Sequence, residues 1–259
     1  MIRILAIGDI VGTKTLELLS KRLWGWRSEL QIDFVVANGE NATEIHGICA
    51  RDARLLLDAG TDLITLGNHT YGIRDIYDFL DAEASTIIRP ANYPPTCPGC
   101  GYAIRDVCGY RLLCININGT VFMEPLDNPF TTIERILERE QGHYDTALLD
   151  IHAEATSEKL AIARKFDGKI GIMFGTHTHV ATADEQVLPN GSGYITDLGM
   201  SGPEDGILGT RTEAVLCRMQ THMPAHFTVA EGELRIHGAV FEWDPSANRC
   251  RSVRRVTLS

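Results

Sequence analysis

The feature that most constrains the fold is a pattern that occurs five times, a short apolar segment that ends in a polar tip. The tips are Asp9, Glu40-Asn41, Asn68-His69, His152, and His177 with His179. Between the segments lie stretches such as KTLELLSKRLWGWRSEL, whose apolar residues recur every three or four positions as in amphipathic helices. Strands that alternate with helices are typical of a mainly parallel sheet covered on both faces.

This alternation also predicts where the polar tips lie. Right-handed crossovers bring the carboxyl ends of parallel strands to one edge of a sheet, and ligands bind beyond that edge. A single histidine or aspartate at a strand end is usually a turn residue. Because all five segments end in such residues, we expect the tips to gather into one site.

The last part of the chain follows a different pattern. After Pro203, the segments EAVLCRM, HFTVAEGELRIHGAVFEW and RSVRRVTLS are predicted to be antiparallel strands, with a turn at Glu231-Gly232. In the preceding region, Thr131 is predicted to cap the helix FTTIERILEREQ. The sequence contains no repeat or linker, so residues 1–259 are expected to form one domain of the α/β class, with a mainly parallel core and antiparallel C-terminal strands.

Charge and hydropathy narrow the possible partners. A net charge of −10 argues against a nucleic-acid polymer as the main partner, because such binding depends on Lys and Arg. It does not exclude a small phosphate ester, because bound metal ions would add local positive charge. No apolar run reaches the roughly 18 to 20 residues of a membrane span. Seven scattered cysteines fit a reducing compartment, so we expect a cytoplasmic protein with no membrane partner.

The segment CPGC, from Cys97 to Cys100, has three interpretations. With Cys108 and Cys114 it could form a zinc site, or it could act as a redox pair. Cys114, however, lies in a predicted strand. The Pro-Gly pair between Cys97 and Cys100 is typical of a turn. A turn with incidental thiols is therefore the preferred interpretation.

The polar tips have the chemistry of a metal centre. Carboxylate, amide oxygen and imidazole form a mixed ligand set that suits Fe, Mn or Zn better than Ca²⁺ or thiolate-binding ions. The tips provide enough ligands for two ions with one bridging carboxylate. Two ions ~3.5–4 Å apart can clamp a phosphate and activate water for attack on it.

The motifs GDIVG, NGEN, GNHTYG, HAEATSEK and GTHTHVATAD occur in this order. They resemble the calcineurin-like metallophosphoesterases, and most closely the bacterial YmdB-type branch. The segments YITDLGMSGP and NINGTVFM fit that branch as well, so the resemblance covers essentially the whole chain. It implies a layered α/β sandwich and a dinuclear iron centre. It also implies hydrolysis of 2′,3′-cyclic nucleotides to 3′-nucleotides by a hydroxide bound between the metals.

The same resemblance implies a role for each residue at the tips. Asp9, Asn41 and His179 would bind the first ion, Glu40 would bridge both ions, and Asn68, His152 and His177 would bind the second. His69 would be the general acid, and Asp184 is expected to orient a loop or a histidine near the metals.

The chain departs from the wider superfamily at two of these positions. Val11 stands where a histidine is usual, and Glu40 replaces an aspartate. The loss of a nitrogen ligand favours iron, with manganese possible and zinc disfavoured.

The sequence leaves other functions open. The same metal centre could serve a phosphomonoesterase or a 3′,5′-cyclic nucleotide phosphodiesterase. A regulatory metal-binding protein with vestigial catalysis is a further alternative, although such a protein would not need His69 beside the metals. Self-association into a homo-oligomer is also possible, but no interface pattern identifies the contact.

Overall fold

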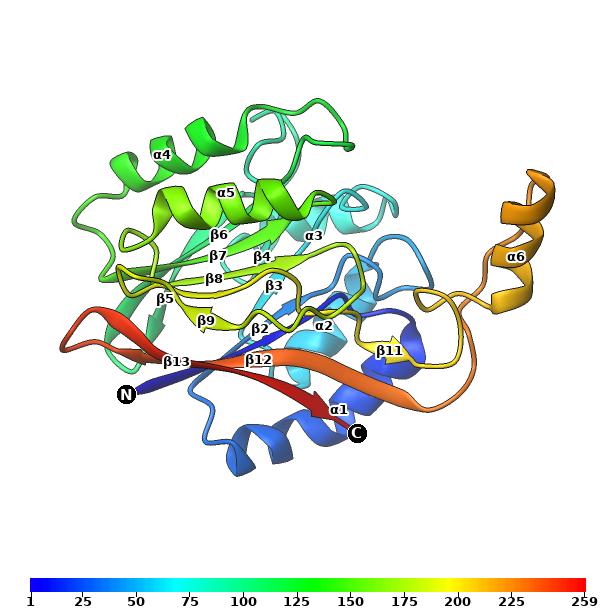
Figure 1. The fold of residues 1–259 in the computed structure, drawn as a ribbon, viewed down its shortest axis with the longest axis horizontal. Coiled ribbons are helices and arrows are strands. Elements are labelled where there is room, and N and C mark those ends of the chain that lie inside the picture. Colours follow the sequence, from blue (N-terminus) through cyan, green and yellow to red (C-terminus); the bar gives the residue numbers. More distant parts are fainter.

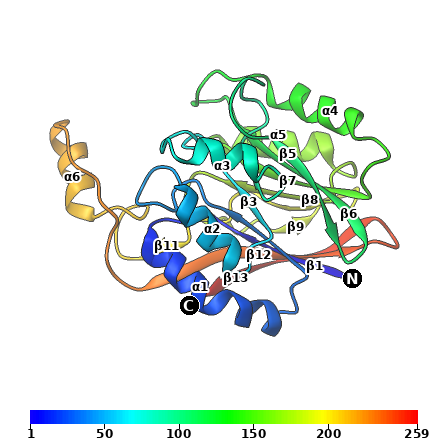
Figure 2. The same cartoon turned by 180° about the vertical axis from the view of Figure 1, so that it is seen from behind.

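The computed structural model describes residues 1–259 and consists of two sheets that pack face to face between two layers of helices (Figures 1 and 2). The first sheet has the order β11-β12-β1-β2-β3-β4, and β13 pairs with β12 at one side. Its strands are β1 (Ile2–Ile7), β2 (Phe34–Asn38), β3 (Leu63–Thr65), β4 (Ile87–Ile88), β11 (Gly202–Pro203), β12 (Leu234–Asp244) and β13 (Arg249–Leu258).

The second sheet has the order β5-β6-β7-β8-β10-β9. Its strands are β5 (Tyr102–Val107), β6 (Tyr110–Asn118), β7 (Thr146–His152), β8 (Ile172–Thr176), β9 (Gln186–Val187) and β10 (Gly193–Ile195). In each sheet the central strands are parallel, β1 to β4 in the first and β6, β7, β8 and β10 in the second. Antiparallel strands, including β12 and β13 at the C-terminus, lie on one side of them in the first sheet, and β5 and β9 lie at the two edges of the second.

Five helices cover the two outer faces, and α6 (Thr212–Thr221) does not. The five are α1 (Thr13–Glu29), α2 (Ala50–Asp58), α3 (Ile76–Ala82), α4 (Pro129–Arg139) and α5 (Thr156–Phe166). Leu19 of α1 and Leu56 of α2 belong to the core that covers the first sheet, whereas Ile133 of α4 and Phe166 of α5 belong to the core that covers the second.

A third core fills the space between the sheets. It includes Ile4 and Phe241 from the first sheet and Leu148 and Phe174 from the second. The rings of Phe174 and Phe241 lie 6.3 Å apart, centre to centre. Because the central strands are buried on both faces, they read as continuous apolar runs in the sequence. The predicted α/β sandwich is confirmed, but the parallel strands are divided between two sheets.

Two expectations about local structure were wrong. The segment EAVLCRM lies in helix α6. In HFTVAEGELRIHGAVFEW the strand β12 begins only at Leu234, so the first eight residues, 226–233, are not part of it. A short apolar run does not distinguish a helix from a strand, which explains the error. Helix α4 begins at Pro129, and Asn128, not Thr131, caps it by accepting hydrogen bonds from the backbone N–H groups of Phe130 and Thr131.

Helix α6 stands away from the rest of the molecule in both views of the ribbon (Figures 1 and 2). Val215 is its one buried residue. None of the helices is long and apolar enough to cross a membrane.

Candidate metal centre

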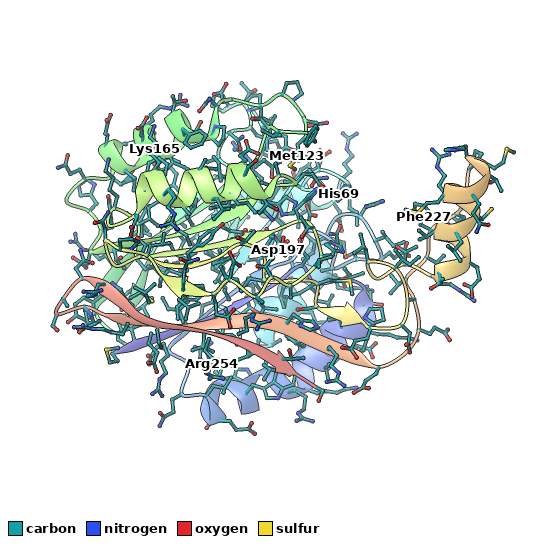
Figure 3. The ribbon with its side chains drawn as sticks, in the orientation of Figure 1. His69, Met123, Lys165, Asp197, Phe227 and Arg254 are labelled. Atoms are coloured by element: carbon teal, nitrogen blue, oxygen red, sulfur yellow. The ribbon has the colours of Figure 1, made fainter.

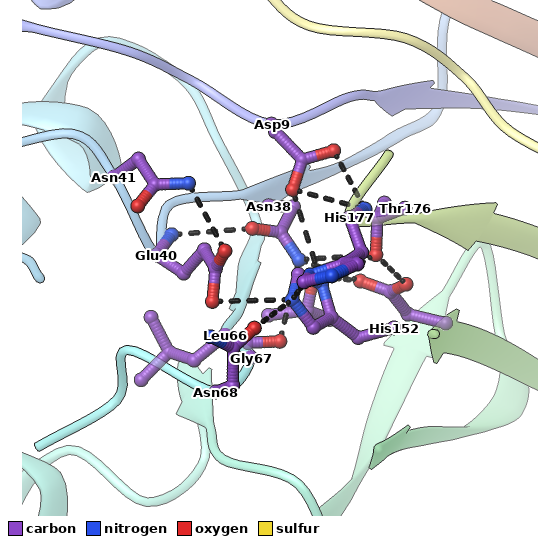
Figure 4. Close-up of polar contacts among 12 residues, drawn as sticks. Asp9, Asn38, Glu40, Asn41, Leu66, Gly67, Asn68, His152, Thr176 and His177 are labelled. Atoms are coloured by element: carbon purple, nitrogen blue, oxygen red, sulfur yellow. Dashed lines mark hydrogen bonds and ion pairs between the residues drawn. The ribbon is translucent and has the colours of Figure 1, made fainter. Parts of the chain in front are cut away.

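The structure brings the five polar tips together, as the sequence predicted. Asp9, Glu40-Asn41 and Asn68-His69 follow β1, β2 and β3 of the first sheet. His152 ends β7, and His177 and His179 follow β8, in the second sheet. The site therefore lies where the strand ends of both sheets meet (Figure 4).

The residues expected to bind the second ion surround one atom. His152 Nε2 lies 2.9 Å from Asn68 Oδ1, 3.1 Å from His177 Nδ1 and 3.2 Å from Glu40 Oε2. An imidazole nitrogen carries at most one proton, so one hydrogen bond cannot account for its closeness to all three atoms. Ligand atoms that are each about 2.1 Å from a common octahedral ion lie about 3 Å from one another. The spacing of Glu40, His152 and His177 thus fits a metal ion.

Hydrogen bonds on the outer side of each ring support this fit. His152 Nδ1 lies 2.9 Å from Thr176 Oγ1, which in turn donates to Asp150. His177 Nε2 lies 3.1 Å from Glu154 Oε2, and His179 Nδ1 lies 3.4 Å from the carbonyl oxygen of Leu208. Each outer nitrogen lies beside an acceptor, and with a proton on that side the inner nitrogen of each ring would present a lone pair to a bound ion.

Asn41 gives a second, independent indication. Its Oδ1 atom is buried and has no hydrogen-bond partner, while its Nδ2 atom lies 3.0 Å from Glu40 Oε1 and 3.3 Å from His179 Nε2. The two amide atoms of Asn are interchanged by a half-turn of the side chain. That half-turn would place Oδ1 beside Glu40 and His179, where an oxygen ligand of the first ion is expected.

The charges of the site are arranged as a cation-binding cluster. Asp9 and Glu40 are both buried, and burial raises the pKa of Asp9 to about 6 despite the opposing attraction of His179 and His152. Burial also acts against ionisation of Glu40, but attraction and a hydrogen bond from His152 outweigh it and hold its pKa well below the usual range. Two buried carboxylates need compensating positive charge, which bound cations can supply.

The backbone of the two histidines after β8 is strained. His177 and His179 have φ angles of 97° and 63°, in a region that residues with side chains rarely adopt. Such strain persists only where surrounding contacts enforce it, and it is concentrated at functional sites. Here the His177 N–H donates to Asp9 Oδ2 at 3.1 Å.

A buried ion pair holds the turn that carries these two histidines. Lys159 Nζ donates to Asp197 Oδ2 at 2.7 Å, and both side chains are about 1% exposed. The same carboxylate accepts hydrogen bonds from the backbone and hydroxyl of Thr178, which lies between His177 and His179.

His69 lies beside the cluster and outside its inner contacts. Its backbone N–H donates to Glu40 Oε2 at 3.1 Å, and its Nε2 atom lies 3.2 Å from Asn68 Nδ2. Its ring is 4.3 Å from that of His46, centre to centre. Burial lowers the pKa of His69, although attraction by Glu40 acts in the opposite direction. The ring of His69 thus lies next to the cluster without being one of its inner contacts.

Several supporting residues were missed by the sequence reasoning. Asp150 is fully buried and accepts hydrogen bonds from Thr176, Thr65 and Asn38, which together orient His152. A carboxylate two residues before a strand-end histidine was the available signal. Glu154 is another supporting residue, because its carboxylate contacts His177.

Asp184 orients a loop and contacts no histidine. Its carboxylate accepts hydrogen bonds from the hydroxyl of Thr182 and from the backbone and hydroxyl of Thr196. These contacts agree with the expectation that Asp184 orients a loop, and not with the alternative that it orients a histidine.

The fold and the cluster define the class of protein. The structure superposes on the crystal structure of a phosphatase from Mycoplasma pneumoniae with a TM-score of 0.93, at 29% identity, covering 99% of this chain and 93% of that one. A structure of a hypothetical protein from Thermus thermophilus gives a TM-score of 0.93 at 39% identity and covers 99% of both chains. The prediction of an enzyme of the phosphodiesterase and phosphatase class is confirmed.

The family follows from the whole length of the sequence. The model of the YmdB-like protein family matches residues 5–256, and the chain belongs to this family. The 2′,3′-cyclic-nucleotide 2′-phosphodiesterase of Bacillus subtilis (strain 168) is 38% identical over 257 residues, which cover 99% of this chain and 97% of that protein. The family predicted from the motifs is therefore confirmed.

Proposed function

We propose that the protein is a two-metal phosphodiesterase that hydrolyses 2′,3′-cyclic nucleotides to 3′-nucleotides. The observation that carries the proposal is the set of inner nitrogen and oxygen atoms that meet around His152 Nε2. The activity printed for the Bacillus subtilis relative supports this choice of substrate. The Asn41 oxygen that lacks a partner supports the use of a metal.

The ligands divide between two positions in the proposed centre. Asp9, Asn41 and His179 would hold the first ion, and Asn68, His152 and His177 the second. Glu40 would bridge them, since its Oε1 faces Asn41 and its Oε2 faces His152. When bound, the ions would neutralise phosphate charge and make water acidic enough to react at neutral pH. Oxygen-rich ligation favours iron, then manganese, over zinc.

His69 would protonate the departing ribose oxygen. A ribose alkoxide is a poor leaving group, and a positioned acid contributes roughly 10²–10⁴ in rate. The hydrogen bond from its backbone to Glu40 fixes the residue beside the centre, and contact with His46 limits the motion of its ring. His69 could then deliver a proton to the substrate without serving as a ligand.

A panel of phosphate esters tests the proposed activity. It contains 2′,3′-cyclic AMP, 3′,5′-cyclic AMP, 3′-AMP and a linear diester, each assayed with added Mn²⁺ or Fe²⁺ and with a chelator. We expect preferential hydrolysis of the 2′,3′-cyclic ester to 3′-AMP, and loss of turnover with chelator. Preference for another ester would make the protein a different phosphoesterase. Metal binding without turnover of any ester would make it a regulatory metal-binding protein.

A further inference from the structure

One exposed aromatic residue near the centre has no structural explanation. Phe122 has 89% of its surface exposed, the highest value among the exposed large hydrophobic residues, and Met219 follows with 67%. Its φ angle of 63° also lies in the left-handed region, which is a strained conformation for a bulky residue. Packing accounts for neither property.

The loop that carries Phe122 starts at the metal centre. It spans residues 119–127, after β6, whose last residue Asn118 pairs with the proposed ligand His152 of β7. The Gly119 N–H donates to the carbonyl oxygen of His152 at 2.9 Å. A Cβ atom at Gly119 would collide with the carboxylate of Glu158 and with Ala153, so only glycine allows this approach.

The reach of the loop keeps Phe122 close to the site. Three residues span at most about 10 to 11 Å, which limits the distance between the Cα atoms of Gly119 and Phe122. Met123, the neighbour of Phe122, lies at the same end of the sheets as His69 (Figure 3).

Hydrogen bonds from buried residues hold the loop in place. The side chain of Asn92 bonds to the backbone of Asn118 at one end of the loop and to that of Asp127 at the other, at 2.9 to 3.1 Å. Glu158, which is 6% exposed, accepts from the backbone N–H groups of Thr120 and Val121 and from the Thr120 hydroxyl, at 3.0 to 3.3 Å. These hydrogen bonds fix the backbone of the loop that carries Phe122.

We infer that Phe122 is the platform on which the base of the substrate nucleotide stacks. This inference rests on the proposed function, because a cyclic nucleotide is the substrate that brings a base to the centre. Every base has a flat π-face, so an exposed ring on a rigid loop binds it with little loss of conformational freedom. The metals would then hold the phosphate while Phe122 holds the other end of the substrate.

The test compares a substrate that has a base with one that lacks it. Phe122→Ala, Phe122→Leu and Phe122→Trp are assayed on 2′,3′-cyclic AMP and on glycerol 1,2-cyclic phosphate. All three variants keep a Cβ atom, so the strain at this position is retained. Met219→Ala, an exposed apolar residue on α6, is the control.

We expect Phe122→Ala to raise KM for 2′,3′-cyclic AMP about 5- to 100-fold with kcat unchanged, the range that loss of one stacking contact gives. Phe122→Trp should keep the wild-type KM, and Phe122→Leu should behave like the alanine variant. None of the three should change kcat/KM for glycerol 1,2-cyclic phosphate, and Met219→Ala should change neither substrate. Equal losses on both substrates, or no loss on the nucleotide, would overturn the inference.

Binding measurements separate this inference from the proposed activity. Wild type and Phe122→Ala, both loaded with Mn²⁺, are titrated with 3′-AMP and with inorganic phosphate. Weaker binding of 3′-AMP alone in the variant supports the platform even if no cyclic nucleotide is hydrolysed. Unchanged binding of 3′-AMP, or a change in mass by light scattering as the sole effect, would assign Phe122 to another role such as subunit contact.

Discussion

At the residue scale, the site depends on the orientation of three imidazole rings. The outer ring nitrogens of His152, His177 and His179 lie beside Thr176, Glu154 and the carbonyl oxygen of Leu208, respectively. A proton on the outer nitrogen of each ring would leave the inner nitrogen with a lone pair for an ion. This orientation is built into the fold, because every acceptor lies on a strand or a loop next to its histidine.

His69→Ala should lower kcat by about 10² to 10⁴ while metal content stays at the wild-type level. The reason is that His69 contacts Glu40 through its backbone, which alanine retains, and supplies only a proton through its ring. Turnover and elemental analysis on the same preparation provide the measurement. Loss of metal together with activity would make His69 a ligand instead.

Thr176→Val should weaken metal binding about 10- to 100-fold, the usual effect of removing a partner of a ligating histidine. Valine keeps the shape of the side chain but leaves His152 Nδ1 without an acceptor and Asp150 without one of its donors. Competition against a fluorescent chelator measures the affinity. Thr131→Val, on the exposed side of α4, is the matched control and should have no effect.

At the element scale, the strand-end tips could be predicted from the sequence because parallel strands place their carboxyl ends at one edge. The division of those strands between two sheets could not be predicted. A strand that is buried on both faces shows the same apolar run whether the strands form one sheet or two. Asp150 was missed because its one signal, a carboxylate two residues before a strand-end histidine, does not reveal that this carboxylate is buried. The exposure of Phe122 could not be predicted, because loops have no periodicity from which an exposed side chain could be inferred.

Lys159→Met should lower the free energy of unfolding by about 3 to 5 kcal/mol, because it leaves Asp197 buried without its counter-charge. Urea denaturation measures the loss. Lys165→Met is the matched control, since the Lys165–Glu134 pair is 41% and 39% exposed and should contribute less than about 1 kcal/mol. Similar losses in both variants would show that the buried pair does not specially stabilise the histidine loop.

At the scale of the whole molecule, the centre joins the two sheets. Asp9, Glu40 and Asn68 come from the first sheet, and His152 and His177 come from the second. Apart from this site, the sheets are held together mainly by the apolar core between them. Bound ions should therefore stabilise the complete fold.

Addition of Mn²⁺ at about 100 times its Kd should stabilise the protein by about 2.7 kcal/mol, provided the ion binds only the folded state. Thermal unfolding with metal and with chelator measures the difference. In Glu40→Ala, which lacks the proposed bridge, the metal should have little effect on Tm. A full shift in that variant would place the stabilising ion elsewhere.

The most direct test of the two-metal centre is anomalous diffraction from crystals grown with Mn²⁺ or Fe²⁺. We expect two peaks about 3.5–4 Å apart, with Glu40 between them and His152 and His177 on one ion. A map with no peak among these residues, or with one ion that does not contact Glu40, would contradict a two-metal centre.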